Sequence, residues 1–262
     1  MWHRTPLVAF DLETTGVDVE ADRIVTAAVI GIAGDTAAPY EWLADPGVEI
    51  PAGASEVHGI TTEHARQHGE PAHDVVDQVA EALAVRVRLG DPIVGHNVTF
   101  DLTLLDRECR RHDVEPLLDR LGEAPLRVLD TRVLDQHCMP YRKRPSETQG
   151  ARQLITLAQV YDLPWDESEA HGCAYDALMS ARVLYRIGTL AHTPPEQWPN
   201  SIRTARRLRF RQLDGLDLDG LHAAQIEWAA AQAAGLQTYF RKSDPTAVVD
   251  GTWPLRPLGA SS

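Results

Sequence analysis

The segment that most constrains the fold is LVAFDLETTG, residues 7–16, in which an apolar run leads directly into two acidic residues. Four consecutive apolar residues bounded by polar ones are typical of a buried strand. Residues two apart in a strand point to the same face, so Asp11 and Glu13 project together while Leu12 enters the core. Two like charges side by side are unfavourable unless a cation neutralises them. The segment therefore predicts a strand whose end carries a pair of carboxylates.

Paired carboxylates of this kind suit a metal ion. Oxygen ligands favour Mg²⁺ or Mn²⁺ over zinc. Thr14, Thr15 and Gly16 are then expected to form a turn whose backbone passes close to the ligand of the carboxylates. By itself, however, so short a pattern equally fits a solvated strand end followed by a turn. The metal interpretation depends on acidic residues elsewhere in the chain.

A third carboxylate follows a second strand-like segment, IVGHNVTFD. The pattern predicts a helix over residues 97–112 with Asn97 as its N-cap. Asp101 lies about one turn into this helix, so its side chain can face the end of the strand. The alternative is a first-turn acid that the helix dipole favours. His96 is equally compatible with a structural role.

The segment HGCAYDA supplies a histidine and a fourth carboxylate. A helix is expected over about residues 174–190, with His171 on the loop at its start and Asp176 in its first turn. A neutral imidazole there could take a proton from an attacking water near neutral pH. The alternative is a loop histidine and an exposed aspartate without a shared role.

Taken together, DxETTG, GHNxxFD and HxxxxD resemble, in order and at sensible separations, the three motifs of the DEDD superfamily of 3′→5′ exonucleases. His171 stands five residues before Asp176, as in the DEDDh branch. The other branch has tyrosine four residues before that aspartate, where this chain has Gly172. The segment VHGIT, residues 57–61, resembles the proofreading ε-subunit type. The resemblance covers roughly residues 5–190.

The resemblance implies two-metal hydrolysis of terminal phosphodiesters of single-stranded nucleic acid, DNA favoured, to nucleoside 5′-monophosphates. It implies two divalent cations, Mg²⁺ or Mn²⁺, and His171 as general base. The implied metal ligands and catalytic acids are Asp11, Glu13, Asp101 and Asp176. The implied substrate-binding residues are Thr14, Thr15, His58, Ile60, Asn97 and Phe100. Expected partners are single-stranded DNA or RNA 3′ ends and a polymerase or repair protein.

Several alternatives stay open at this point. His58 and Ile60 also fit a loop that only packs against the sheet, and Phe100 also fits the core. The substrate can instead be RNA, as for ribonuclease T or oligoribonuclease. No feature of the sequence identifies residues that distinguish RNA from DNA by its 2′-hydroxyl. A non-catalytic protein that binds strand ends is a further alternative. All five catalytic-type residues are present, which argues against it.

One position departs from the family pattern. The residue after the motif histidine is commonly polar, whereas here it is Gly172. A glycine beside His171 predicts an unusually mobile histidine loop.

The remaining patterns predict an α/β, ribonuclease H-like fold, a mixed five-stranded sheet flanked by helices. The expected strands are residues 7–10, 23–32, 40–43, 93–94 and 127–130. The expected helices are residues 71–89, 97–112, 153–161 and 175–190.

A boundary near Thr193-Pro194-Pro195 predicts an exonuclease domain over residues 1–192 and a mostly helical extension of unknown role over residues 193–262. The extension is expected to contain an arginine-rich helix over residues 201–212 and an alanine-rich helix over residues 220–240. The alanine-rich helix would pack on the domain or form a dimer contact. The arginines would pair with the protein's own acids, or Arg203, Arg206 and Arg207 would share a helical face and guide a single strand.

Composition limits the remaining classes. The net charge of −13 argues against a protein that coats nucleic acid through its overall electrostatic field. Any contact with nucleic acid is therefore expected to be short and confined to one cleft. No apolar run reaches the roughly 18–20 residues that span a bilayer, and the N-terminal residues lack a signal-peptide pattern. The 3 cysteines are odd in number and widely spaced. They indicate neither a disulfide framework nor a zinc motif, so a cytoplasmic location is expected. The oligomeric state is not determined by the sequence.

Overall fold

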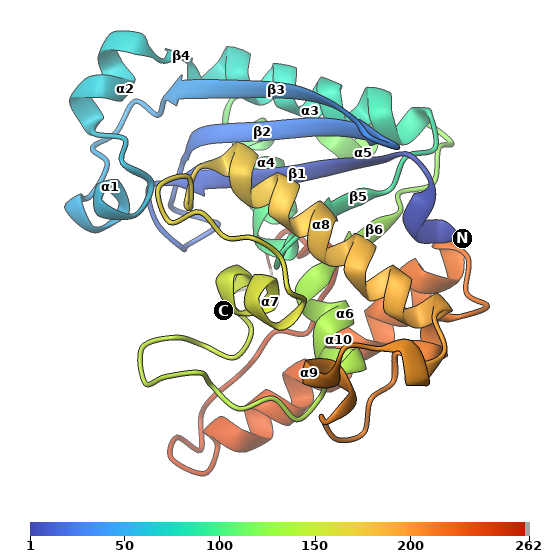
Figure 1. The fold of residues 1–262 in the computed structure, drawn as a ribbon. Helices are drawn as coiled ribbons and strands as arrows, with labels where there is room; N and C mark the ends of the chain where they lie inside the picture. Colours follow the sequence, from blue (N-terminus) through green and yellow to red (C-terminus); the bar gives the residue numbers. More distant parts are fainter. Residues whose placement is uncertain (260–262) are drawn as a thin grey trace.

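The computed structural model describes residues 1–259, which fold around a single mixed sheet (Figure 1). Its strand order is β4-β3-β2-β1-β5-β6. The strands are β1 (Leu7–Thr14), β2 (Ile24–Ala33), β3 (Thr36–Asp45), β4 (Glu70–Pro71), β5 (Ile93–Gly95) and β6 (Val128–Asp130). The first three form an antiparallel meander, and β5 pairs in parallel with both β1 and β6. The predicted α/β class is confirmed.

The sheet has six strands, so the prediction of five missed one. The additional strand is β4, which has only two residues and pairs with the end of β3. Two residues are too few to show a periodic pattern. Pro71 within it cannot donate a backbone hydrogen bond and is tolerated because the strand lies at the sheet edge.

Helices cover both faces of the sheet (Figure 1). They are α1 (Ala52–His58), α2 (Thr62–His68), α3 (Ala72–Arg88), α4 (Thr99–Arg111), α5 (Leu117–Arg120), α6 (Thr131–Cys138), α7 (Leu154–Val160) and α8 (Cys173–His192). The sequence predicted α3, α4, α7 and α8 to within two residues at each end. It did not predict α1, α2, α5 or α6, whose four to eight residues are too short for a clear helical period.

Alternation along β1 decides which side chains face which helices. Val8, Phe10 and Leu12 are buried with the side chains of α3 and α4. Ala9 is buried on the opposite face with those of α8. Side chains of a strand point to the two faces in turn. The two acidic residues of β1 therefore lie on the same face as Ala9, toward α8.

The predicted N-cap of α4 is wrong. Val98 occupies the cap position and makes no side-chain capping bond, whereas Asn97 has a left-handed backbone with φ of 62°. The backbone N–H of Asn97 donates to the carboxylate of Asp130 over 3.0 Å. Its side-chain oxygen accepts from Arg132 over 2.6 Å. These contacts from β6 and α6, distant in sequence, override the local capping preference.

The predicted arginine-rich helix is also wrong. Helix α9 (Asn200–Arg203) ends at Arg203, Arg207 has a positive φ of 54°, and a short 3₁₀ turn follows over Phe210–Leu213. Ile202, Phe210 and Leu213 are fully or almost fully buried in the core cluster that contains α8. Burial of these apolar side chains requires the chain to turn, so Arg203 and Arg207 share no helical face. Another 3₁₀ turn (Pro195–Gln197) precedes this segment.

The alanine-rich helix α10 (Leu218–Phe240) packs on the sheet edge at β6. Gln225 is fully buried, accepts from the backbone N–H of Asp130 over 2.8 Å and donates to the carbonyl of Val128 over 2.9 Å. His222 Nδ1 accepts from the N–H of Val128 over 3.1 Å. An edge strand exposes unpaired backbone groups, and these two side chains satisfy them. The alanine-rich helix therefore packs on the domain, which is one of the two arrangements that we expected from the sequence.

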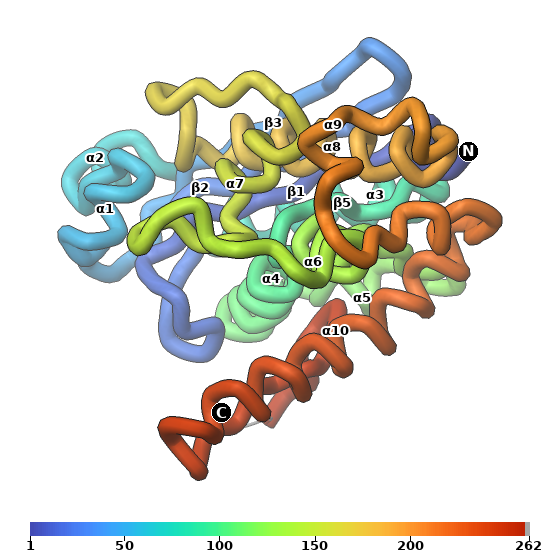
Figure 2. Tube along the Cα trace, turned by 60° about the horizontal axis from the view of Figure 1, so that its bottom comes forward, coloured from blue at the N-terminus to red at the C-terminus, as the bar shows by residue number. Residues whose placement is uncertain are grey.

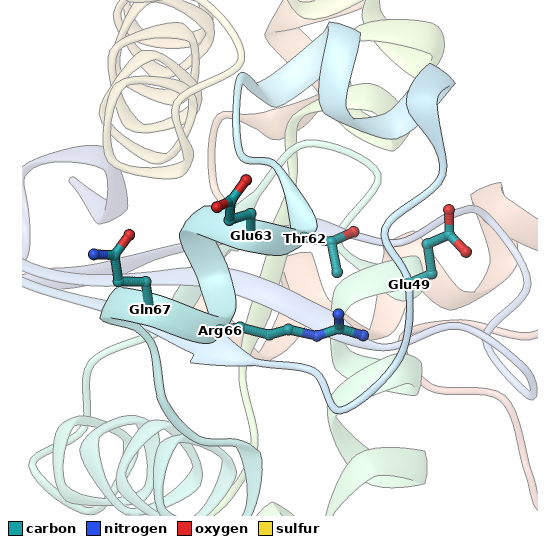
Figure 3. A pocket seen from close by; sticks show the side chains of 5 residues that line it. All are labelled: Glu49, Thr62, Glu63, Arg66 and Gln67. Atoms are coloured by element: carbon teal, nitrogen blue, oxygen red, sulfur yellow. The ribbon is translucent and has the colours of Figure 1, made fainter.

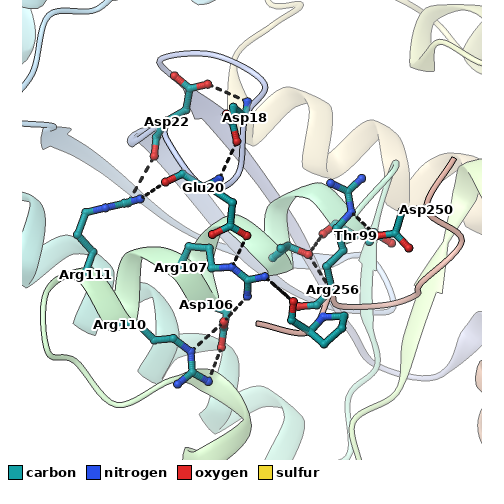
Figure 4. A network of polar contacts seen from close by, with 12 residues as sticks. Asp18, Glu20, Asp22, Thr99, Asp106, Arg107, Arg110, Arg111, Asp250 and Arg256 are labelled. Atoms are coloured by element: carbon teal, nitrogen blue, oxygen red, sulfur yellow. Dashed lines mark hydrogen bonds and ion pairs between the residues drawn. The ribbon is translucent and has the colours of Figure 1, made fainter. Parts of the chain in front are cut away.

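The segment after α10 returns across the molecule to α4. Trp253 is buried in the same core cluster as α4. Arg107 on α4 donates to the carbonyls of Arg256 and Pro257, over 3.2 and 2.9 Å (Figure 4). Both ends of the extension are therefore fixed to the domain. Within residues 1–259, none of the helices combines the length and apolar character needed to cross a membrane.

Candidate functional site

Three of the predicted carboxylates converge where β1 meets α8. Ligand oxygens of Asp11, Glu13 and Asp176 all lie within 4.8 Å of one another. The geometry follows from two local features. Strand alternation turns both acids of β1 toward α8, and Asp176 occupies the first turn of that helix.

Asp101 approaches the same place from α4. It is only 5% exposed, and its Oδ1 accepts from the backbone N–H of Leu12 over 3.2 Å. Leu12 lies between the two acids of β1, so this bond fixes Asp101 beside them. Because β5 runs parallel to β1, helix α4 begins at the same edge of the sheet where β1 ends. Asp101 lies outside the trio within 4.8 Å, yet its charge still acts on Asp11 and Glu13.

Burial raises the pKa of all four carboxyls, and repulsion within the cluster adds to the rise for Asp11 and Glu13. Burial, with the charges of the other three acids, raises the pKa of Asp11 well above its usual range. Burial and the same repulsion raise the pKa of Glu13 to about 8. Burial raises the pKa of Asp101 to about 7 and that of Asp176 to about 6. Such values mark carboxyls that lack the positive charge needed to ionise easily.

The donor set fits a hard divalent cation. Asp176 Oδ1 is buried and has no hydrogen-bond partner within residues 1–259. An orphaned carboxylate oxygen beside two further carboxylates offers all-oxygen coordination, which Mg²⁺ and Mn²⁺ accept. A bound cation would also offset the repulsion that raises the pKa values of Asp11 and Glu13.

His171 lies on the loop before α8, as predicted. The residue is exposed and has a left-handed backbone with φ of 64°. Its charge opposes the rise in the pKa of Asp176, which places the two side chains close together. Both line a cleft of about 760 Å³. The helix-start loop thus presents the histidine beside the carboxylates.

The conformational strain of this loop falls on His171 and not on Gly172. Gly172 has an ordinary φ of −94°, and its N–H donates to the carbonyl of Glu169 over 3.1 Å. A Cβ added at Gly172 would meet that same carbonyl oxygen at 3.2 Å. Left-handed backbone is uncommon for residues other than glycine and is often found at functional sites.

Thr14 and Thr15 shape the turn after β1 with their hydroxyl groups. Thr14 Oγ1 donates to the carbonyl of Gly16 over 2.6 Å. Thr15 is buried, and its Oγ1 donates to Asp22 over 2.7 Å and accepts from the N–H of Arg23 over 3.0 Å. Both hydroxyls are already used within the protein, which leaves the backbone of this turn to face the site.

His58 and Ile60 are connected through the loop after α1. The N–H of Ile60 donates to His58 Nδ1 over 3.1 Å. Burial lowers the pKa of His58, an effect that the nearby backbone of Thr14 opposes. His58 Nε2 is buried and makes no hydrogen bond of acceptable geometry within the described residues. The ring is therefore neutral, lies near the end of β1 and has one nitrogen free.

The remaining predicted positions differ in their roles. Asn97 is exposed and lines the cleft with His171. Phe100 is partly buried and packs against the core cluster of α3 and α4, the alternative that the sequence left open. His96 has both ring nitrogens occupied, by Thr131 Oγ1 at 2.9 Å and the carbonyl of Arg152 at 2.8 Å. It is a structural histidine that ties α6 to the cleft loop.

Sequence reasoning missed three residues that shape the cleft. Asp130 is the N-cap of α6 and orients Asn97. Arg132 and Arg152 line the cleft that contains His171. The only signal for Arg132 was its place in the polar run that follows the buried strand β6.

A separate hollow of about 680 Å³ lies at α2 (Figure 3). Its lining residues are Glu49, Thr62, Glu63, Arg66 and Gln67. It contains none of the predicted catalytic or binding residues, and its charges are of both signs. We assign it no part in the site.

Comparisons with known proteins agree with this geometry. Residues 8–184 match the family model described as "Exonuclease". The chain is 27% identical to ribonuclease T of Hahella chejuensis, over 69% of this chain and 82% of that protein. It is 31% identical to the PolC-type DNA polymerase III of Streptococcus pneumoniae, over 68% of this chain but only 11% of the polymerase. The chain thus spans about a tenth of the length of such relatives.

The fold is also that of a solved nuclease. Escherichia coli exonuclease I in complex with a dT13 oligonucleotide aligns with a TM-score of 0.57 and 19% identity. The alignment covers 71% of this chain and 41% of that one.

Proposed function

The chain belongs to the exonuclease family, and from this premise we propose that it hydrolyses the 3′-terminal phosphodiester of single-stranded nucleic acid. The products would be nucleoside 5′-monophosphates, and DNA would be the favoured substrate. One observation carries the proposal: one buried and three half-buried carboxyls with raised pKa values meet beneath a cleft that also contains His171. The family match predicted from the three motifs is confirmed.

The four carboxylates would hold two divalent cations, Mg²⁺ or Mn²⁺. Asp11, Glu13 and Asp176 provide the convergent oxygens, and Asp101 contributes from α4. When bound, such cations stabilise charge on the attacking and leaving oxygens of the phosphodiester.

His171 would act as general base. Its exposed position on the loop before α8 leaves the imidazole free to accept a proton from the attacking water.

The terminal nucleotide would lie against the turn after β1. The backbone around Thr14 and Thr15 would contact its sugar, and the free Nε2–H of His58 would donate a further hydrogen bond. Ile60, Asn97 and Phe100 would line the nucleotide pocket.

The experiment compares purified protein with its Asp11→Asn variant on 5′-labelled single-stranded DNA and RNA of equal length. Each reaction would contain Mg²⁺, Mn²⁺ or EDTA. The proposal predicts a metal-dependent ladder that shortens from the 3′ end and is absent from the variant. Intact substrate with the native protein and either cation would contradict catalysis and favour the alternative of a strand-end-binding replication or repair protein.

A second candidate function is trimming of RNA 3′ ends. It is favoured by the match to ribonuclease T, which extends over 82% of that protein's length. Faster shortening of the RNA in the same experiment would select it.

A polymerase or repair protein remains the proposed partner, because the PolC-type relatives carry the matching segment within a polymerase. Co-elution of this chain with its host's replicative polymerase would test the association, and elution of the chain alone would oppose it.

A further inference from the structure

The catalytic cleft continues into a second, larger hollow. The cleft with His171 and Asp176 has a volume of about 760 Å³, and the second hollow about 860 Å³. Asn97, Arg132 and Arg152 line both. The two hollows therefore form one groove that runs from the carboxylates toward α10, which crosses below α4 and α6 in Figure 2.

The outer wall of the second hollow comes from the C-terminal extension. It consists of the second half of α10 and the segment over residues 249–256. These residues lie beyond the family match, which ends at residue 184. Gln225 fixes one end of this wall to β6, and Arg107 fixes the other end to α4. The wall is thus a built part of the protein and not a loose tail.

Two exposed aromatic rings line this hollow. Tyr141 is 61% exposed and Tyr239 is 64% exposed. Each has a cation near its ring, Arg207 at 5.3 Å from the Tyr141 centroid and Lys242 at 5.4 Å from the Tyr239 centroid. Exposed aromatic rings with neighbouring cations suit ligands that combine flat rings with negative charge.

Arg132 is the lining cation without an acidic partner. Its guanidinium donates to Asn97, and no carboxylate within residues 1–259 pairs with it. Arg152 is neutralised by Asp135, and Arg256 pairs with Asp250 over 3.3 Å. The groove thus offers one available positive charge, at the junction of its two halves.

Asp130 is the other acid that lines the second hollow. Its Oδ1 accepts from three backbone N–H groups, those of Asn97, Arg132 and Val133. These bonds direct that oxygen toward the backbone of the protein.

We propose that this second half of the groove binds the unpaired nucleotides immediately 5′ of the terminal nucleotide. Bases stack on Tyr141 and Tyr239, and Arg132 contacts a phosphate between them and the carboxylates. The inference rests on the proposed function, since it requires the 3′ end to lie at the carboxylates. Every base has a stacking face, so this part of the groove binds without sequence preference.

Continuity with the catalytic cleft selects a nucleic-acid strand over a peptide as the occupant. A strand that leaves the carboxylates must pass Arg132 before it reaches the tyrosines. The net charge of −13 also excludes a general electrostatic attraction, so recognition depends on these local contacts.

The test uses Tyr239→Ala and Tyr141→Ala, with Tyr40→Ala as a matched control. Tyr40 is 62% exposed on β3 and lines neither half of the groove. Affinity for 5′-fluorescein dT12 is measured by anisotropy in EDTA, and cleavage of dT12 and of the dinucleotide dT2 is measured with Mg²⁺. Thermal unfolding confirms that each variant is folded.

Loss of one stacked base should weaken dT12 binding by about fivefold or more. The KM for dT12 should rise in parallel, and the KM for dT2, which places only one nucleotide in this half of the groove, should rise less. The control should match the wild type. Arg132→Gln should reduce the salt dependence of dT12 binding, lowering the slope of log K against log salt by about 0.7.

The outcomes separate this inference from the proposed function. Unchanged dT12 affinity in both tyrosine variants would contradict binding of the strand in this groove. Cleavage of dT12 by the wild type would still support the exonuclease activity. Weakened dT12 binding in the variants, with no cleavage by the wild type, upholds the groove and overturns the exonuclease. No binding of dT12 by the wild type overturns the groove directly.

Discussion

Two groups of buried or half-buried acids in this protein have opposite surroundings. Asp106, Glu108 and Asp135 are at most 4% exposed, and each pairs with at least one arginine. Figure 4 shows one such network, in which Asp106 contacts Arg107 and Arg110. The chain can therefore neutralise buried carboxylates with its own cations.

The second group consists of Asp11, Glu13, Asp101 and Asp176, which no arginine or lysine pairs with inside residues 1–259. Their pKa values are raised, and one oxygen of Asp176 is orphaned. A buried carboxylate without a counter-charge is costly, so an unpaired cluster implies a charge supplied from outside. This contrast supports the proposal that the first group stabilises the fold and the second binds cations.

The largest expected effect comes from Asp11→Asn. Removal of the central carboxylate should lower the exonuclease rate by about 1,000-fold, because cation stabilisation of the transition state is worth several kcal/mol. The metal-free variant should be at least as stable as the wild type, since it loses an unfavourable buried charge. Rates on labelled single strands and unfolding curves in EDTA measure the two effects. A variant that is both active and less stable would show that Asp11 stabilises the fold, like the acids paired with arginine, and is not needed for catalysis.

The converse effect is expected for Asp135→Ala. Asp135 is fully buried between Arg142 and Arg152 and accepts from Tyr161 over 2.7 Å. Removal of one member of a buried pair should cost about 3–5 kcal/mol of unfolding free energy. Urea unfolding measures this cost. A loss below about 1 kcal/mol would show that these arginines do not depend on their buried acid.

The carboxyls of the unpaired group should make the stability of the metal-free protein depend on pH. The folded pKa values of Asp176, Asp101 and Glu13, about 6, 7 and 8, lie above the ordinary 3.8 to 4.5. In this window the folded state binds more protons at these carboxyls than the unfolded state does, so their contribution to stability falls as pH rises from about 4 to about 8. His3 and His137, whose pKa values burial lowers to about 4, contribute the opposite slope up to about pH 6.5. Thermal unfolding of metal-free protein across this range measures the fall.

Two controls identify the source of that fall. Mg²⁺ or Mn²⁺ should flatten the profile, and Glu13→Gln should remove part of it. A metal-free wild-type profile that superimposes on the Glu13→Gln profile would contradict the assignment of these acids as an unpaired cluster.

The smallest effect is expected for Arg110→Ala. This arginine is exposed and bonds to Asp106, which also retains Arg107. An exposed ion pair contributes about 0.2–1 kcal/mol, so unfolding should change by no more than that. A larger loss would show that Asp106 depends on both arginines.

Much of the site could be predicted from local sequence patterns. Alternation in LVAFDLE placed Asp11 and Glu13 on one face, and helical spacing placed Asp176 in the first turn of a helix. These are one-dimensional regularities of strands and helices, so they are visible without the fold.

The errors arose where contacts distant in sequence determined the conformation. Asn97 does not cap α4 because Asp130 and Arg132 hold it in a left-handed conformation. The arginines after Arg203 do not form a helix because Phe210 and Leu213 are buried beside α8. The groove of the extension was equally invisible, because Tyr141 and Tyr239 are brought to one hollow only by the folded chain.

The most direct test of the account is calorimetric titration of Mn²⁺ into metal-free wild-type protein and its Asp11→Asn variant at pH 7. The account predicts that the wild type binds Mn²⁺ with release of protons from the carboxyls, which appears as a buffer-dependent heat. The variant should bind at least tenfold more weakly. Equal Mn²⁺ binding by the two proteins, or none by the wild type, would contradict the claim that the unpaired carboxylates are reserved for a cation.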